Sequence, residues 1–163
     1  MSVAEIIDAI QPHQCNLVEI TGGEPLLQDD VPELAQELLN RKYTVLIETG
    51  GALDISVLPL DVIKIMDIKC PESGMMNEMN WSNIEKLTPR DELKFVINSR
   101  ADYEWSKKVL NDLQLHNRNT ILFSPVYQKM QPEILAEWIL QDNLPVRFQI
   151  QLHKVLWGET PGK

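Results

Sequence analysis

The chain has 163 residues, of which 44% are hydrophobic and 24% charged, a composition typical of a globular domain and unlike that of a disordered segment. Its formal net charge of −9 disfavours binding to nucleic acid or to an anionic membrane surface, because no run of basic residues offsets the acidic ones. No apolar stretch approaches the ~18 residues that span a bilayer.

Helices and strands are predicted to alternate along the chain. The predicted helices cover residues 3–10, with Ser2 as the N-cap, 81–87, 101–115 and 132–141, with a helical turn at 54–58. A further amphipathic helix is predicted to be capped by Asp29 or Asp30, with Pro32 in its first turn and Leu34, Leu38 and Leu39 on its inner face. The predicted strands cover residues 17–21, 43–49, 62–69, 92–97, 120–126 and 148–153. Short connections and the absence of a Ser/Gly-rich linker predict one α/β domain over residues 1–163. Its parallel sheet of about six strands would form an incomplete β/α barrel or an open sheet.

Most predicted strands are apolar on one face and become polar on the other face toward their carboxyl ends. The polar residues are Glu19, Thr21, Glu48, Asp67, Lys69, Glu92, Lys94, Gln149, Gln151 and His153. Ligands of β/α barrels and open α/β sheets bind at the carboxyl ends of the strands. Any single one of these residues could equally be solvated or form a structural ion pair such as Asp67–Lys69. The whole set favours a ligand pocket, because a parallel sheet is covered on both faces and must pair what it buries.

The sharpest local motif is Thr21-Gly22-Gly23-Glu24-Pro25, at the end of the first predicted strand. Two glycines at a strand end let the backbone approach a ligand closely, and Pro25 biases Glu24 toward an extended conformation. Such a bend can direct backbone carbonyls and the Glu24 carboxylate at an ammonium group. Gly-Gly alone is also typical of an ordinary tight turn, so the motif gains weight only from its context.

That context resembles the Gly-Gly-Glu-Pro motif of radical S-adenosylmethionine enzymes, which holds the amino group of the methionine moiety. Other segments follow in the order found in one family of that superfamily, the 7-carboxy-7-deazaguanine synthases. They are Glu48-Thr49-Gly50-Gly51, Asp67-Ile68-Lys69-Cys70-Pro71-Glu72-Ser73-Gly74, Asp91-Glu92-Leu93-Lys94-Phe95-Val96, Ser124-Pro125-Val126 and Gln151-Leu152-His153-Lys154-Val155-Leu156-Trp157. The resemblance extends over residues 17–157.

The resemblance implies a carbon–nitrogen lyase that converts 6-carboxy-5,6,7,8-tetrahydropterin to 7-carboxy-7-deazaguanine in queuosine and deazapurine biosynthesis, the tRNA modification pathway. The cofactors it implies are S-adenosylmethionine, a [4Fe-4S] cluster and Mg²⁺. It assigns S-adenosylmethionine binding to Gly22, Gly23, Glu24, Asp67, Ile68, Lys69, Ser124, Pro125, Val126 and Tyr127. Thr21 and His153 would face the pterin-like substrate, although His153 could also be a packed imidazole. Glu48 and Lys94 would lie in the pocket.

The sequence departs from the family in its cysteines. The family's cluster is held by three closely spaced cysteines, and a nearby threonine binds Mg²⁺, whereas this chain has only Cys15 and Cys70, far apart. We therefore expect the chain to be N-terminally truncated relative to the family, inert by itself, and without catalytic residues or metal ligands of its own. A non-catalytic S-adenosylmethionine-binding or partner-interaction domain is the alternative, and an unrelated α/β protein with chance matches is a third reading.

The expected surroundings of the chain follow from the same features. Two separated cysteines indicate free thiols in a reducing cytoplasm, and Glu5 lies where a signal peptide carries basic residues. The expected partner is a small molecule, with no nucleic acid and no membrane. An uncovered strand edge at residues 17–21 would allow a homodimer.

Overall fold

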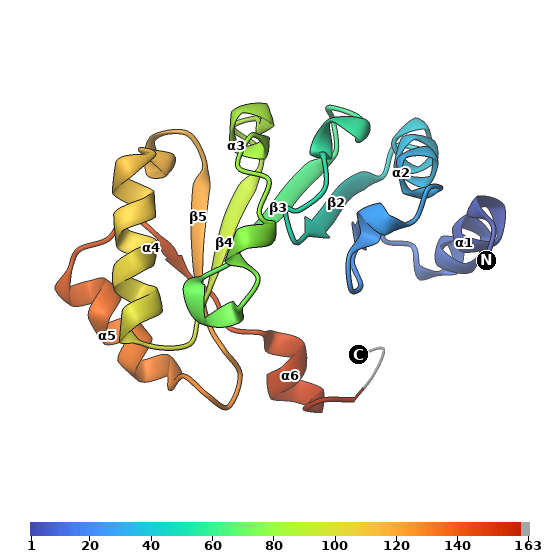
Figure 1. Cartoon of the computed structure of the whole chain (residues 1–163). Coiled ribbons are helices and arrows are strands. Elements are labelled where there is room, and N and C mark those ends of the chain that lie inside the picture. The colour runs from blue at the N-terminus through green and yellow to red at the C-terminus, as the bar shows by residue number, and fades with distance from the viewer. Residues whose placement is uncertain (161–163) are drawn as a thin grey trace. The chain divides into compact units, whose positions relative to one another are not determined.

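The computed structural model describes residues 1–160, and its contacts divide the chain into two compact units. Unit 1 comprises Met1–Asp67 and Glu78–Asp91, and unit 2 comprises Ile68–Asn77 together with the described residues from Glu92 onward. Both units alternate helices with parallel strands, as the predicted α/β class requires. Figure 1 shows the order of the elements along the chain.

Unit 1 is built around three strands that pair in parallel in chain order. Its strands are β1 (Leu17–Ile20), β2 (Thr44–Thr49) and β3 (Ile63–Ile68), and its helices are α1 (Val3–Ile10), α2 (Val31–Asn40) and α3 (Asn83–Lys86). The register places Ile20 beside Ile47 and Thr49 beside Met66. Because the strands are parallel, the segments that follow β1 and β2 leave at the same edge of the sheet.

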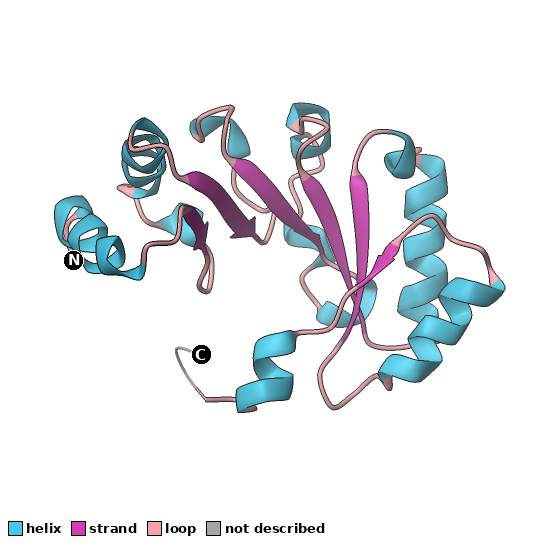
Figure 2. Cartoon of the chain, turned by 180° about the vertical axis from the view of Figure 1, so that it is seen from behind, coloured by secondary structure: helices cyan, strands magenta, loops and turns pink. Residues whose placement is uncertain are grey.

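The core of unit 1 lies between β2 and the first two helices. Leu38 of α2 and Val45 and Ile47 of β2 are completely buried, and Ile7 of α1 packs against the same cluster. Figures 1 and 2 show α1 and α2 side by side. Ser2 caps α1 as predicted, because its hydroxyl accepts the Glu5 N–H while the Glu5 carboxylate accepts the Ser2 N–H at 2.7 Å.

Unit 2 contains three further parallel strands and the longest helix. Its elements are β4 (Glu92–Ile97), α4 (Arg100–Asp112), β5 (Thr120–Pro125), α5 (Pro132–Gln141), β6 (Arg147–Phe148) and α6 (Leu152–Trp157). Tyr103 joins α4 to α5, because its hydroxyl shares its one proton between the Trp138 carbonyl at 2.7 Å and the Asp142 carboxylate at 2.8 Å. The rings of Phe95 on β4 and Phe123 on β5 pack against each other, with their centroids 5.4 Å apart.

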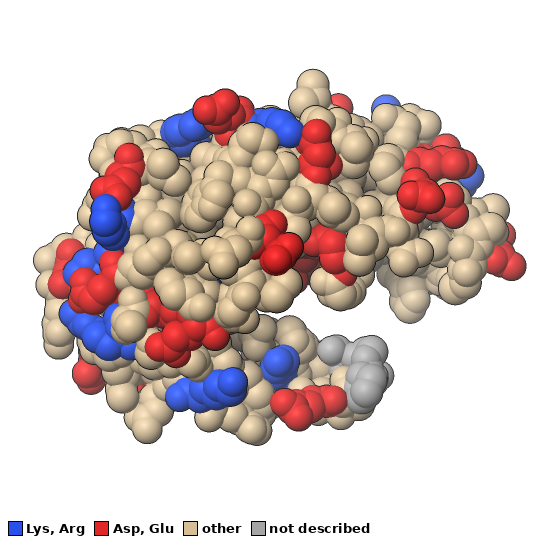
Figure 3. Space-filling model, in the orientation of Figure 1, with Lys and Arg blue, Asp and Glu red and all other residues tan. Residues whose placement is uncertain are grey.

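Charged side chains over α4 pair with one another and form no free basic surface. Lys107 lies 3.2 Å from Glu104 and 2.6 Å from Asp142, and Arg100 pairs with Glu104 at 2.5 Å. Figure 3 shows basic and acidic side chains interleaved in this region. None of the helices formed by residues 1–160 combines the length and apolarity needed to cross a membrane.

Three predicted elements are wrong in their bounds. The predicted helix 101–115 ends early at Asp112, because Gln114 takes a left-handed conformation with φ 52°. The predicted helix 81–87 is reduced to α3, because the Asn80 side chain accepts the Ser82 N–H at 3.3 Å and holds the chain in a turn. The predicted strand 148–153 is reduced to the two residues of β6. Gln149 N–H still donates to the Phe123 carbonyl at 2.9 Å, after which the chain turns into α6. His153 therefore lies exposed on a helix and does not alternate with Gln149 on a strand face.

Candidate functional site

In unit 1, the segments after β1 and β2 form the first candidate site. Thr21, Gly22 and Gly23 leave β1 with exposed backbone, and Gly22 has φ +149°, a conformation that glycine adopts more readily than other residues. Apart from the glycine itself and its two chain neighbours, no heavy atom of the described residues lies within 4 Å of the Cβ position of either glycine. The backbone here can therefore be approached closely by a ligand, as the Gly-Gly pair predicts.

The Glu24 carboxylate is held by three neutral donors from two segments. Leu26 N–H donates to Oε1 at 3.1 Å, and Gly50 N–H donates to Oε2 at 2.7 Å. The Thr49 hydroxyl lies 2.9 Å from Oε1 and 3.0 Å from Oε2. Glu24 is half-buried and extended, with φ −144° and ψ 105°. Its side chain therefore ties the loop after β1 to the end of β2.

The turn that follows β2 is fixed by packing as well as by hydrogen bonds. Gly51 has φ +76°, and a Cβ at this position would lie 3.0 Å from Met79 Cε and 3.1 Å from Met66 Cγ. Gly51 N–H donates to Thr49 Oγ1 at 3.3 Å, and the Gly51 carbonyl accepts from Asn83 Nδ2 at 3.2 Å. Thr49 and Asn83, both buried, thus form the support behind Glu24.

Asp91, which begins one of the recognised segments, has a structural place in unit 1. Its carboxylate is completely buried, accepts the Lys64 N–H at 2.7 Å and forms an ion pair with Lys64 Nζ at 3.4 Å. Its other oxygen accepts the Thr88 N–H at 2.7 Å. Lys64 is also buried, so this pair holds the start of β3 to the residues before β4.

In unit 2, a second carboxylate ties the loop after β3 to the end of β4. The Glu72 side chain accepts Asn98 Nδ2 at 2.6 Å and the Ser99 hydroxyl at 2.5 Å. The buried Asp102 accepts the Glu72 N–H at 3.1 Å and the Asn98 N–H at 3.2 Å. The hydrogen bonds from Ser99 and Asn98, together with the Lys129 charge, lower the pKa of the Glu72 carboxyl.

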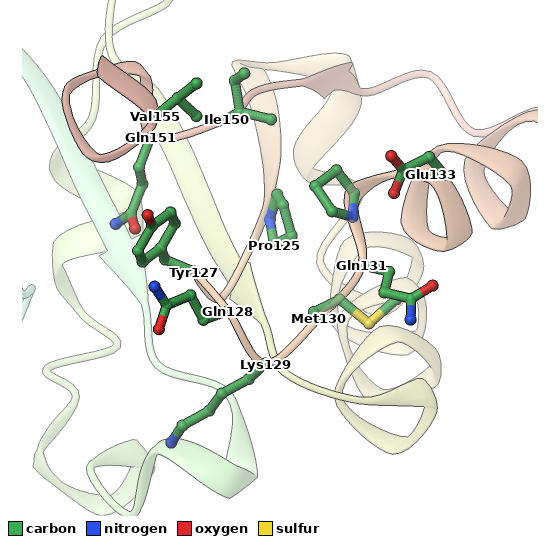
Figure 4. A pocket seen from close by; sticks show the side chains of 11 residues that line it. Pro125, Tyr127, Gln128, Lys129, Met130, Gln131, Glu133, Ile150, Gln151 and Val155 are labelled. Carbon is green, nitrogen blue, oxygen red and sulfur yellow. The ribbon is translucent and has the colours of Figure 1, made fainter. Parts of the chain in front are cut away.

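A pocket of about 580 Å³ lies in unit 2 between the end of β5, the start of α5 and α6 (Figure 4). Pro125, Tyr127 and Gln151 line it, and Lys129, also at its edge, extends away from the other labelled side chains in Figure 4. Lys154 Nζ lies over the Tyr127 ring, 5.6 Å from its centroid, at cation–π distance. The pocket walls are mainly apolar, with a few polar groups at the edge, as in small-molecule sites.

The predicted S-adenosylmethionine residues therefore fall into two sets. Gly22, Gly23 and Glu24 are grouped in unit 1, where Asp67 is half-buried at the end of the unit. Pro125 and Tyr127 line the pocket of unit 2. The other predicted residues of unit 2 differ in exposure, with Ile68 and Ser124 buried and Lys69 and Val126 half-buried.

For the predicted substrate and pocket residues, the structure gives positions only. Thr21 is exposed beside Gly22, and His153 is exposed on α6 and is absent from the pocket lining. Glu48 and Lys94 are half-buried on β2 and β4, on the face opposite the buried Ile47 and Leu93. Sequence reasoning missed Thr49 as a partner of Glu24, although the Glu-Thr-Gly-Gly segment contains it.

The described residues offer no site for the metals that the resemblance implies. Within residues 1–160, no group of three or more His, Cys, Asp or Glu side chains is placed to hold a metal ion. Cys15 is exposed in unit 1, and Cys70 is buried in unit 2 with its sulfur 3.5 Å from the Ser106 hydroxyl. Two such cysteines do not fit a [4Fe-4S] cluster, which normally has Cys₄ ligation.

Comparison with known proteins gives several extensive similarities, although no family model matches the chain. It is 42% identical to the 7-carboxy-7-deazaguanine synthase of Koribacter versatilis, over 90% of this chain and 71% of that protein. It is 40% identical to the enzyme of the same name from Chlorobaculum tepidum, over 97% of this chain and 73% of that protein.

Two solved structures share its fold. The crystal structure of QueE from Escherichia coli matches with a TM-score of 0.70 and 21% identity, over 93% of this chain and 64% of that chain. Streptococcus suis SuiB bound to S-adenosylmethionine matches with a TM-score of 0.61 and 14% identity, over 90% of this chain and 40% of that chain. These matches confirm the predicted fold class, an incomplete β/α barrel of parallel strands.

Proposed function

The chain belongs to the 7-carboxy-7-deazaguanine synthase family, and on this premise we propose that it binds S-adenosylmethionine and a pterin-like substrate for that family's lyase reaction. That reaction converts 6-carboxy-5,6,7,8-tetrahydropterin to 7-carboxy-7-deazaguanine with loss of ammonia. The chain spans 64% of the QueE chain that it matches, so the proposal concerns the functions that its own residues can serve.

The observation that carries the proposal is the geometry around Glu24. The backbone of Gly22 and Gly23 is open to a ligand, and the adjacent carboxylate is fixed by Leu26, Thr49 and Gly50. A fixed carboxylate beside accessible backbone carbonyls suits a primary ammonium group, which has three hydrogens to donate. We assign this place to the amino end of S-adenosylmethionine, the radical source in this superfamily.

Within unit 2 taken by itself, we propose that the positions assigned by the resemblance contact the cofactor. Pro125 and Tyr127 line an apolar pocket of a volume suited to a small molecule, which supports their assignment. Lys69 and Val126 are half-buried and accessible in part, whereas Ile68 and Ser124 are buried, so their assignment rests on the resemblance alone. In unit 1, Asp67 is the remaining residue that the resemblance assigns to the cofactor, and it is half-buried on β3.

For the pterin-like substrate, we retain Thr21 and His153 as proposed contacts. The hydroxyl of Thr21 is exposed one residue from Gly22, so a substrate beside the cofactor's amino end could accept its hydrogen bond. His153 is exposed on α6, where its imidazole is free to donate or accept at the surface of unit 2.

The cluster and Mg²⁺ are not assigned to residues of this chain, because the two cysteines and the described acidic residues do not fit them. The same observation favours a second candidate function. In this function, Gly22, Gly23 and Glu24 would bind S-adenosylmethionine without catalysis, and the chain would act as a binding module or as the partner of another chain. The two cysteines, Cys15 and Cys70, would have no part in cofactor binding.

Titration calorimetry of the full chain with S-adenosylmethionine tests the proposal. Replacing Glu24 with Ala removes a charge-assisted hydrogen bond worth roughly 1.5–3 kcal/mol, so binding should weaken about ten- to a hundredfold. Glu33→Ala is the matched control, since Glu33 is an exposed carboxylate on α2 in the same unit. Equal affinity of the wild type and Glu24→Ala, with both proteins folded by circular dichroism, would show that Glu24 does not bind the amino group of S-adenosylmethionine.

Self-association is a separate part of the proposal. β1 is short and pairs with β2, and Leu17 is 55% exposed, so the strand offers apolar and backbone groups to a second copy. Light scattering at micromolar protein should then detect a dimer. A strictly monomeric chain would remove this expectation without affecting the cofactor site.

A further inference from the structure

We propose that Thr49 is a positioning residue for the S-adenosylmethionine site, acting through the Glu24 carboxylate. This inference rests on the proposed function and goes beyond it, because Thr49 itself would not touch the ligand. The Thr49 side chain is buried, with 3% of the residue exposed, at the last position of β2. Its hydroxyl lies 2.9 Å and 3.0 Å from the two oxygens of Glu24.

A hydroxyl has one proton, so Thr49 shares a single donor between both carboxylate oxygens. Gly50 N–H and Leu26 N–H each donate to one oxygen, which brings the number of donors to three. A carboxylate has about four acceptor positions, which leaves room for one more donor. Within residues 1–160, none of the hydrogen-bond partners of Glu24 is a cationic side chain, so its negative charge is oriented but not neutralised.

The direction of the Thr49 hydroxyl is fixed by the backbone of Gly51. Its oxygen accepts the Gly51 N–H at 3.3 Å, so its proton is left to point at Glu24. Gly51 in turn is held by Asn80 N–H at 3.0 Å and Asn83 Nδ2 at 3.2 Å, both donating to its carbonyl. Asn83 is fully buried and also accepts the Ile55 N–H at 3.3 Å. Freezing the carboxylate before the ligand arrives lowers the entropy cost of binding.

This arrangement predicts an effect confined to one end of the ligand. S-Adenosylhomocysteine has the amino acid end of S-adenosylmethionine, whereas 5′-methylthioadenosine lacks it, and both are uncharged at sulfur. A residue that orients Glu24 should matter for the first ligand and not for the second. A residue that only maintains the fold should change the affinity for both ligands.

The test is titration calorimetry of the full chain with both ligands, using the wild type, Thr49→Val and Thr49→Ser. Val has nearly the shape of Thr but no hydroxyl, whereas Ser keeps the hydroxyl. We expect Thr49→Val to weaken S-adenosylhomocysteine binding about tenfold and 5′-methylthioadenosine binding less than about twofold. Thr49→Ser should restore affinity to within about twofold of the wild type. Thermal melting of each variant checks the fold, and Thr49→Ala repeats the test if Thr49→Val is unfolded.

Other outcomes overturn the inference in distinguishable ways. Equal weakening for both ligands in Thr49→Val would mean a structural role, and unchanged binding of both would mean that Glu24 is held well enough without the hydroxyl. Either result leaves the proposed function intact, because the wild type still binds. A wild type that binds neither ligand would overturn the proposed function and this inference with it.

Discussion

Two glutamates, one in each unit, each connect a loop to the end of a strand through hydrogen bonds to the carboxylate, but their surroundings differ. Glu24 ties the loop after β1 to the end of β2, and Glu72 ties the loop after β3 to the end of β4. Glu24 is half-buried and its donors come from Thr49 and two backbone N–H groups. Glu72 is exposed, and Asn98 and Ser99 donate side-chain hydrogens to it.

The two glutamates differ in whether the carboxylate remains available to a ligand. Glu72 lies in the field of Lys129, and its own N–H is bound by Asp102, so its charge and its backbone are both engaged within the protein. Glu24 is positioned by neutral groups beside two glycines with open Cβ positions. The same kind of loop-to-strand contact can therefore be purely structural in one unit and, as we propose, position a ligand-binding carboxylate in the other.

The largest effect on stability should come from replacing Asp102, the buried residue whose carboxylate accepts the Glu72 N–H. Asp102→Ala would leave the N–H groups of Glu72 and Asn98 without their acceptors, at a cost of about 2–3 kcal/mol in the free energy of unfolding. Urea denaturation measures this, with Asp112→Ala as the control on the same helix. Asp112 is exposed, and within the described residues its ion pair is with Lys108, so its loss should cost less than about 1 kcal/mol. Similar losses from both variants would contradict a fastening role for Asp102.

Two glycine substitutions in unit 1, Gly51→Ala and Gly23→Ala, should differ in their effect on stability, because Gly51 is closely packed and Gly23 is open. Gly51→Ala combines a left-handed φ with contacts of 3.0–3.1 Å to Met79 and Met66, so we expect a loss of about 1–3 kcal/mol in unfolding free energy. Gly23→Ala meets no heavy atom of the described residues within 4 Å and should change stability by less than about 0.5 kcal/mol. Thermal and urea denaturation compare the two variants.

Gly23→Ala should nevertheless weaken S-adenosylhomocysteine binding, because its methyl group projects where the ligand would approach the backbone. Calorimetry on the same samples decides this. Unchanged affinity in a folded Gly23→Ala protein would show that the ligand does not approach this stretch of backbone, and would weaken the contrast between the two glutamates.

The smallest effect concerns the titration of Glu72. Hydrogen bonds from Ser99 and Asn98 lower the pKa of the Glu72 carboxyl, so the stabilisation they give is present above its ordinary pKa. It is lost as the pH falls through the lowered value. In Ser99→Ala the pKa should rise toward the ordinary value, as a carbon-detected NMR titration of the side chain would report. A pKa that does not move would mean that the Ser99 hydrogen bond does not stabilise the charged form.

Much of the architecture followed from local patterns in the sequence. The bounds of β4 and α5 agree with the predicted ones, because their apolar residues keep a strict period and their ends are marked by Pro132 or charged residues. The N-cap of α1 is at Ser2 as predicted, and the structure adds the reciprocal hydrogen bond to Glu5 that makes it a capping box. The predicted strand 148–153 is wrong because its alternating polarity fits a strand, whereas pairing with β5 ends near Phe148 and α6 begins at Leu152, which the alternation does not indicate.

By itself the sequence determined the order of elements, the parallel α/β class and the family, since these depend on periodicity and on motifs read along the chain. Only the tertiary structure decided which group each motif residue meets. Glu24 and Thr49 are 25 positions apart, and their contact exists because β1 and β2 pair in parallel with Ile20 beside Ile47. The same holds for Glu72 with Ser99 and for Asp91 with Lys64, because the distance between side chains depends on strand register and loop packing.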